Sequence, residues 1–387
     1  MNAEELLEII SRGEDGQHQF KSDVTNVNAM AAEMVAFSNS AGGHLLIGVE
    51  DNGKVSGLTR DDITRLNQLV SNAASQSVRP PINPQTQNIA FDNSLVIVVD
   101  IPKGISKPYM DNNGLIWIKN GSDKRKVTAR EEIQRMFQNA GLMHGDEVPA
   151  KGLELSNLDK DYFDVFLQKH YNTSLDDLDI PLGTLLENMN LMQEGVFNIA
   201  GALLFTRHPN FNLPIFIVKA VAFPGNDTNS QTYLDSQDIS GKMLNVFRDS
   251  LGFISRHLHH VQAGQSVNSL GELEIPLLVF EELIANALIH RDYFVSSTIR
   301  LLIFKDRIEI ISPGHLPNNL TVEKIKFGNS NIRNPILVSF ASRILPYRGL
   351  GSGIMRTLNA YPDIEFIDDR ENNLFKAVIK RPPFPTA

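Results

Sequence analysis

The chain has 387 residues, a length that accommodates about two or three domains. Apolar residues make up 42% and charged residues 21%, a composition that is typical of globular proteins and excludes long disorder. The lack of cysteine excludes disulfides, cysteine-ligated zinc, iron–sulfur clusters and thiol nucleophiles, and the net charge of −9 requires any nucleic-acid contact to use a local basic patch.

Two features of the sequence bear on location. No run approaches the roughly 18 uninterrupted apolar residues that a membrane span needs. Residues 1–8 are too acidic for a signal or transit peptide. We therefore expect a cytoplasmic protein that has no membrane partner.

Residues 1–142 are expected to form an α+β domain. Its predicted elements are helices over 2–12, 28–40 and 61–77 and strands over 89–91, 95–101 and 115–119. A β-hairpin is predicted over 44–58, because the Asn52-Gly53 pair favours the left-handed turn that hairpins need. A last helix is predicted from Thr128, which has capping-box spacing to Glu131.

Two further domains are expected after this one. Residues 143–270 are predicted to form a middle region that is mostly helical, with two strands at 200–205 and 215–223. Residues 271–387 are predicted to form a C-terminal module with helices over 275–290 and 353–360 and strands over 298–304, 307–311, 364–368 and 375–380. The sequence as a whole therefore indicates an α+β protein.

The most informative pattern lies in the segment EELIANALIHRD at 281–292. On a helix, Glu282, Asn286 and His290 are four residues apart and share one face, although the segment is otherwise apolar enough to be buried. The glycine-rich run RGLGSGI at 348–354 then directly precedes a helical pattern, so its backbone N–H groups can hold phosphates. A turn, ISPGHL, lies between them at 311–316.

Together these motifs resemble the ATP-binding fold shared by gyrase-type topoisomerases, Hsp90, histidine kinases and mismatch-repair MutL proteins. The resemblance implies an α/β sandwich that binds ATP and Mg²⁺. It implies that Asn286 holds the metal and that Glu282 activates water where hydrolysis occurs. The remaining nucleotide-binding positions that it implies are His290, Gly314, Gly349, Gly351 and Gly353.

Over residues 275–380 the closest resemblance is to a divergent branch of this fold found in bacterial transcriptional regulators. It is carried by EELIANALIHRDY, the ISPG turn, Arg333-Asn334-Pro335 and the GxGxG turn. The sequence departs from the wider family at the motif that binds the adenine amino group, where Ser312 replaces an Asp and Leu316 replaces a Gly. These changes permit an alternative in which the nucleotide site has decayed and the protein is a non-catalytic interaction scaffold.

A second set of motifs occupies residues 1–140. They are QFK at 19–21, AFSNSAGG at 36–43, LLIGVED at 45–51, PY at 108–109 and KNGS at 119–122. In their order along the chain and in their residues, these motifs resemble the Schlafen/AlbA-like DNA-binding domain. Some Schlafen relatives are metal-dependent RNA nucleases that use three acids, and the positions that match here are Glu14, Gln19 and either Glu50 or Asp51. The neutral Gln19 weakens such a metal cluster.

The best local patch for DNA or RNA contact surrounds a predicted turn and helix start. Its members are Lys119, Lys124, Arg125, Lys126 and Arg130. A solvated surface is the alternative interpretation of such a run. Binding through these residues would be directed mainly to phosphates and would weaken with salt.

The sequence thus favours an ATP-responsive transcriptional regulator that binds DNA through its first domain, and the resemblance implies that it pairs with a second copy. The alternatives are an enzyme, either an ATPase using Glu282 or a nuclease using Glu14 and Glu50, and the interaction scaffold. A P-loop helicase is excluded, because no Gly-x-x-x-x-Gly-Lys-Ser/Thr motif exists.

Overall fold

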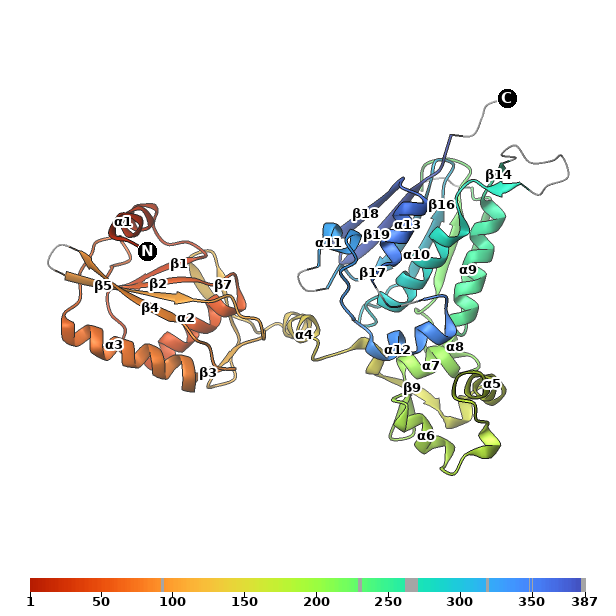
Figure 1. The fold of residues 1–387 in the computed structure, drawn as a ribbon, viewed down its shortest axis with the longest axis horizontal. Coiled ribbons are helices and arrows are strands. Elements are labelled where there is room, and N and C mark those ends of the chain that lie inside the picture. Colours follow the sequence, from red (N-terminus) through yellow and green to blue (C-terminus); the bar gives the residue numbers. More distant parts are fainter. Residues whose placement is uncertain are drawn as a thin grey trace. The chain divides into compact units, whose positions relative to one another are not determined.

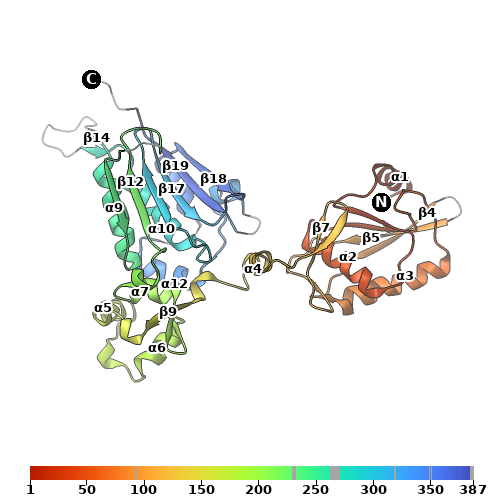
Figure 2. The same cartoon turned by 180° about the vertical axis from the view of Figure 1, so that it is seen from behind.

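The computed structural model describes residues 1–91, 94–228, 232–261, 271–317, 320–347, 349 and 351–383. The chain divides into two compact units, Met1–Met143 and His144–Ala387. Both units combine helices with strands, which confirms the expected α+β class. The two units are shown from opposite sides in Figures 1 and 2 and are described separately below.

The first unit is built around a four-stranded sheet. Its helices are α1 (Ala3–Arg12), α2 (Val27–Asn39), α3 (Arg60–Asn72) and α4 (Arg130–Asn139). Its strands are β1 (His18–Lys21), β2 (Gly43–Ile47), β3 (Val78–Arg79), β4 (Gln85–Phe91), β5 (Ser94–Ile101), β6 (Met110–Asp111), β7 (Trp117–Asn120) and β8 (Asp123–Lys126). The sheet has the order β1-β2-β5-β4, with β1 parallel to β2 and the other pairs antiparallel.

Alternation along β2 explains how this sheet is covered on both faces. Leu45 and Ile47 belong to the core beneath α2 and α3, whereas Leu46 belongs to a separate core with Leu6 of α1. The helix α1 begins as predicted, because Asn2 and Glu5 form a capping box. Figure 1 shows α1 on one side of the sheet and α2 and α3 on the other.

Two local predictions for this unit hold only in part. The hairpin predicted over 44–58 forms only around its turn, where Val49 and Val55 make an antiparallel bridge and the backbone N–H of Glu50 donates to the carbonyl oxygen of Lys54; β2 itself is central in the sheet and pairs with β1 and β5. The capping box predicted from Thr128 does not form, because α4 starts one residue after Ala129, which makes no side-chain cap.

The second unit contains a three-stranded sheet and a six-stranded sheet. Its strands are β9 (Pro149–Glu154), β10 (Met192–Gln193), β11 (Val196–Asn198), β12 (Val218–Ala222), β13 (Asp235–Ile239), β14 (His260–Val261), β15 (Glu272–Leu273), β16 (Ile299–Ile303), β17 (Arg307–Pro313), β18 (Ile364–Asp369) and β19 (Leu374–Lys380). The larger sheet has the order β13-β12-β16-β17-β19-β18, and the smaller has the order β10-β11-β9.

The helices of the second unit are α5 (Lys160–Tyr171), α6 (Leu182–Asn188), α7 (Ile199–Phe205), α8 (Pro209–Asn212), α9 (Met243–His257), α10 (Leu277–His290), α11 (Val322–Lys326), α12 (Pro335–Ile344) and α13 (Gly353–Ala360). Figures 1 and 2 show α9, α10 and α13 on one side of the six-stranded sheet. This arrangement is a two-layer α/β sandwich. One apolar core extends from Ala150 to Ile379.

Residues expected in the middle region and in the C-terminal module share this core. Strand β12 pairs in parallel with β16 inside the larger sheet. Phe205 of α7 also contacts Phe340 of α12, with ring centroids 5.8 Å apart. The strand predicted over 200–205 is wrong, because this segment forms α7, whose seven residues are all buried. The region 143–270 also holds more strands than the two predicted, β9 and β11 among them.

Candidate functional site

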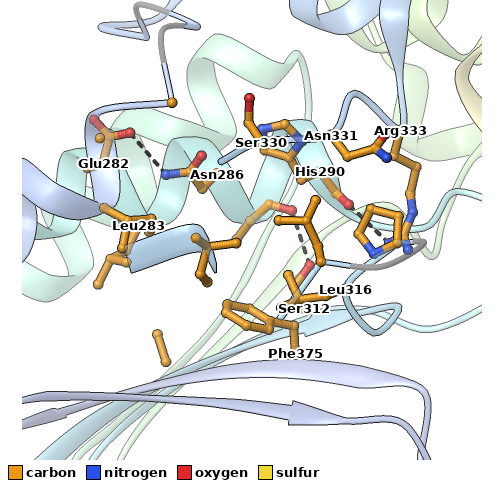
Figure 3. Close-up of a pocket in the computed structure, with 18 of the residues that line it drawn as sticks. Glu282, Leu283, Asn286, His290, Ser312, Leu316, Ser330, Asn331, Arg333 and Phe375 are labelled. Atoms are coloured by element: carbon orange, nitrogen blue, oxygen red, sulfur yellow. Dashed lines mark hydrogen bonds between the residues drawn. The ribbon is translucent and has the colours of Figure 1, made fainter. Parts of the chain in front are cut away.

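A cavity of about 140 Å³ lies in the second unit between α10 and the six-stranded sheet. It is bounded by the carboxyl end of β17, by residues from 314–317 and 320–331, and by the glycine-rich turn before α13. The residues expected to form a nucleotide site all line it: Glu282, Asn286, His290, Gly314, Gly349, Gly351 and Gly353. Figure 3 shows the first three along one face of α10, as their spacing predicts.

The polar face of α10 is internally bonded. Asn286 Nδ2 donates to Glu282 Oε1 across 3.0 Å. Glu282 is only 6% exposed, so its carboxylate needs a compensating charge. Arg356 supplies that charge, with its Nη2 atom 2.9 Å from Glu282 Oε2. The Glu282 carboxylate is therefore held by two donors at one end of the cavity.

The glycine-rich turn approaches this carboxylate so closely that it excludes a side chain. A Cβ atom added to Gly353 would lie 1.6 Å from Glu282 Oε1. A Cβ added to Gly351 would lie 2.2 Å from the carbonyl oxygen of Gly328, and Gly351 also has a φ of +71°, which favours glycine. The glycines thus bring bare backbone to the cavity, as a phosphate-binding turn requires.

The opposite end of the cavity surrounds Ser312 and Arg333. The hydroxyl of Ser312 donates to the carbonyl oxygen of Ala287 across 3.3 Å and is buried. Arg333 Nη2 donates to the carbonyl oxygen of His315 across 2.6 Å, and burial lowers the pKa of Arg333. This end of the cavity therefore presents a guanidinium, whereas the family that it resembles presents a carboxylate.

His290 lies on the cavity wall beside Tyr347. Burial, together with the nearby charge of Arg333, lowers the pKa of His290 to about 4. The ring is therefore neutral near pH 7. Its Nε2 atom lies 2.9 Å from the hydroxyl of Tyr347, a hydrogen-bond distance. His290 can thus act here as a neutral hydrogen-bonding group and not as a cation for phosphate.

The donor chemistry of the cavity fits Mg²⁺ and a phosphorylated ligand. Because Glu282 uses the amide N–H of Asn286, the oxygen of the same amide is the atom that a metal would take. Mg²⁺ is usually held by one or two protein oxygens together with water and substrate phosphates. The exposed backbone created by Gly351 and Gly353 suits the phosphates themselves.

The nuclease positions of the first unit are arranged differently from a metal centre. Gln19 Nε2 donates to Glu14 Oε1 across 2.6 Å, and Lys119 Nζ donates to Gln19 Oε1 across 2.5 Å. Asp51 instead lies 3.6 Å from Lys21 Nζ, and Glu50 lies near Lys54. Among the residues that the structure describes, no group of three His, Asp or Glu side chains could hold a metal ion.

Lys119 belongs to this interior chain of polar groups more than to a surface patch. Its ammonium lies 4.8 Å from the ring centroid of Phe37 and also donates to the carbonyl oxygen of Ser122. Burial lowers the pKa of Lys119. Lys119 lies opposite Lys124 in the β7–β8 pair, but its ammonium is bonded to Gln19 and Ser122.

Three of the other four cationic residues predicted to contact DNA are already ion-paired. The pairs are Lys124 with Glu33 at 2.6 Å, Arg125 with Glu132 at 2.5 Å and Arg130 with Glu131 at 3.2 Å. Lys126 is exposed and makes no ion pair with any described residue. The patch is thus a surface of mixed charge at β8 and the start of α4.

The sequence reasoning missed Arg356, Arg333 and Tyr347, all of which line the cavity. A signal existed for Arg356, since it lies one turn into the helix that follows the glycines. Helical side chains lean toward the amino end of their helix, so an arginine at this position points back to the glycine turn. Arg333 belongs to the Arg333-Asn334-Pro335 motif, but that motif gave it no role in the site, and no signal in the sequence indicates Tyr347; both residues lie in irregular segments.

Comparison with known proteins assigns two domains. Residues 14–128 match the family described as "Schlafen, AlbA_2", and residues 296–375 match the family described as "Putative ATP-dependent DNA helicase recG C-terminal". The chain carries a Schlafen/AlbA_2 domain and a RecG-like C-terminal domain of the ATPase type. No curated protein matches it.

Two solved structures resemble parts or all of the chain. The DIP2311 protein of Corynebacterium diphtheriae is 18% identical over 99% of this chain and 82% of its own, with a TM-score of 0.44. The N-terminal domain of a RecG-related protein of Nitrosomonas europaea, solved by NMR, is 24% identical over 34% of this chain and 96% of its own, with a TM-score of 0.25. In the described part of this chain, no helix has the length and apolar character to cross a membrane.

Proposed function

We propose that this chain is a nucleotide-responsive DNA-binding regulator whose second unit binds ATP with Mg²⁺ and whose first unit contacts nucleic acid. The observation that carries the proposal is the single cavity in which Glu282, Asn286 and the glycine-rich turn meet. These groups come from separate stretches of the chain, and each has the chemistry that one part of a magnesium–nucleotide complex requires.

Each residue has a distinct role in this proposal. Asn286 would hold the metal, and the backbone N–H groups around Gly351 and Gly353 would donate hydrogen bonds to the phosphates. Glu282 is the candidate base for a water molecule, because it is the carboxylate next to the phosphate turn. Mg²⁺, when bound, neutralises the negative charge of the phosphates. Turnover by Glu282 would make the protein a slow ATPase.

The segment that follows the first unit offers a route by which the cavity can influence it. His144 Nδ1 lies 3.1 Å from the carbonyl oxygen of Arg333, whose side chain lines the cavity. Asp146 Oδ2 accepts from the backbone N–H of Leu337 in the first turn of α12 across 2.9 Å. A ligand that moves Arg333 would therefore act on the chain directly after Met143.

In this proposal the protein is a cytoplasmic homodimer that regulates transcription. ATP biases the second unit between two arrangements, and the affinity of the first unit for DNA or RNA changes with that bias. By linkage, nucleic acid must change the affinity for ATP by the same factor. Measurement of either effect therefore tests the coupling.

The primary test is a thermal-unfolding shift of the full chain with Mg²⁺ and ATP, ADP, GTP or a nonhydrolysable ATP analogue. A ligand at about 100 times its dissociation constant should stabilise the native state by roughly 2.7 kcal/mol. We expect a magnesium-dependent ATP shift in the wild type and in Asn212→Ala, which alters an asparagine outside the cavity. Asn286→Ala should abolish the shift.

The absence of a shift with every nucleotide, in a chain that unfolds cooperatively, would refute nucleotide binding and favour the scaffold alternative. A shift that persists in Asn286→Ala would refute the assigned metal ligand. If the shift behaves as expected, nucleic-acid affinity is then measured with and without ATP at several salt concentrations.

A further inference from the structure

The ion pair between Glu282 and Arg356 forms a wall between two hollows. Both side chains line the cavity described above, and both also line a second hollow together with Ser342 and Pro346. Glu282 is nearly buried, whereas the Arg356 side chain is 33% exposed. The cation of this pair therefore has the freedom to move that the carboxylate lacks.

The hydrogen-bonding capacity of Arg356 is not fully used. Its Nη2 atom donates to Glu282, but its buried Nε atom has no hydrogen-bond partner. A buried donor without a partner costs free energy that an incoming acceptor would recover. Because Arg356 lies one turn after Gly353, its guanidinium points back toward the backbone proposed to hold phosphates.

A phosphate at the glycine turn would meet the Glu282 carboxylate at close range. Gly353 already packs against that carboxylate, so two anions would compete for the same space and the same donors. The planar guanidinium of arginine matches a phosphate with two parallel N–H donors, and it forms stronger bonds when its partner is charged. An exchange of partner by Arg356 would place its positive charge on the phosphate and leave Asn286 as the remaining donor to Glu282.

We propose that Arg356 binds the terminal phosphate of a nucleoside triphosphate, releasing Glu282, and so makes the site distinguish triphosphate from diphosphate. This inference rests on the proposed function and adds to it a residue whose contact depends on the number of phosphates in the ligand. In the state without ligand, Arg356 keeps the buried Glu282 neutralised. In the state with triphosphate, Glu282 is free to approach water.

The test is calorimetric titration of the full chain with Mg²⁺ and either ADP or a nonhydrolysable ATP analogue. Arg356→Ala should lower the affinity for the triphosphate by about 10- to 100-fold, the range expected for hydrogen bonds between charged groups, and should change the ADP affinity by less than about threefold. Arg356→Lys keeps the positive charge but lacks the two parallel N–H donors of arginine, so it should retain part of the preference for triphosphate over diphosphate. Arg343→Ala removes an arginine that lines neither hollow and should leave both affinities unchanged.

Arg356→Lys keeps the test decisive if Arg356→Ala does not fold, because a lysine can still neutralise Glu282. In that case an unchanged ratio of triphosphate to diphosphate affinity would overturn the inference. Equal losses for both ligands in Arg356→Ala would also overturn it, since they would assign Arg356 a structural role only. If the wild type binds neither ligand, the proposed function fails as well. If the wild type binds both and the ratio is insensitive to Arg356, this inference fails alone.

Discussion

The substitution Gly353→Ala tests whether the glycine-rich turn rests directly on Glu282. The added methyl group would lie 1.6 Å from Glu282 Oε1, far inside van der Waals contact, so either the carboxylate or the start of α13 must move. The backbone of Gly353 is not in the left-handed region, so it can accept alanine without strain. The effect of the substitution therefore comes from the contact with Glu282.

Two opposing contributions set the expected magnitude. Loss of one partner from a buried ion pair costs about 3–5 kcal/mol, and the partial exposure of Arg356 reduces this to about 2–4 kcal/mol. Replacement of glycine by alanine also restricts the unfolded chain, which contributes about 0.4–1 kcal/mol of stability. We therefore expect Gly353→Ala to lower the free energy of unfolding of the second unit by about 2 kcal/mol.

The assay is urea unfolding followed by two probes. Trp117 is the single tryptophan and lies in the first unit, so its fluorescence reports that unit. Far-ultraviolet circular dichroism reports both units, and the part of its transition that Trp117 does not follow belongs to the second. Gly225→Ala is the matched control, because a Cβ at Gly225 meets no atom within 4 Å, and it should change stability by less than about 0.5 kcal/mol.

A double-mutant cycle isolates the contact. In Gly353→Ala combined with Glu282→Ala, the methyl group no longer meets a carboxylate, so the double variant should lose at least about 1 kcal/mol less than the sum of the single variants. Gly225→Ala combined with Glu282→Ala should be additive. A Gly353→Ala chain as stable as the wild type would refute the close packing of the turn on Glu282.

Two further predictions concern buried polar groups. Burial raises the pKa of Asp146 from 3.8 to about 6, so between these pH values the native state binds more protons than the unfolded state. The free energy of unfolding therefore falls, on the order of 2–3 kcal/mol, as the pH rises through this window. Asp146→Asn should remove this fall, which is measured by urea unfolding at pH 4 and pH 7. Asn39→Ala should cost about 2–4 kcal/mol in thermal unfolding, because Asn39 makes three hydrogen bonds to the backbone of Tyr109 and Trp117, whereas Asn112→Ala, at an exposed asparagine, should cost less than about 1 kcal/mol.

The core of the candidate site could be predicted from the sequence because helical geometry fixes it. Side chains four residues apart share a helix face in any α-helix, so Glu282, Asn286 and His290 follow from spacing alone. The position of the glycine-rich turn in the site could also be predicted, because a phosphate-binding turn needs backbone without side chains and the glycines directly precede a helix. The pairing of Glu282 with Arg356 depends on how α13 packs against α10, a contact between segments 74 residues apart that no local pattern encodes.

The wrong strand prediction over 200–205 arises because short apolar runs do not distinguish a buried helix from a buried strand. The α7 sequence IAGALLF is apolar throughout and has neither period. One local signal was available, since the Asn198 side chain caps the helix by accepting the backbone N–H of Gly201 across 2.8 Å. In the first unit, the continuous run Leu45-Leu46-Ile47 indicates a strand buried on both faces, which is more consistent with a central strand than with an isolated hairpin.

Each unit holds some of its candidate anion-binding cations against carboxylates, although Lys126 is exposed and makes no ion pair with any described residue. Arg356 is paired with Glu282 in the second unit, and Lys124 and Arg125 are paired with acids in the first. An anionic ligand that binds through one of these paired cations must displace a carboxylate of the protein, and the free energy of the broken pair is subtracted from that of binding. In the proposed function, this cost would limit indiscriminate phosphate binding by a chain of net charge −9. A ligand with several negative charges, such as a triphosphate or a nucleic-acid backbone, would recover the cost through additional contacts.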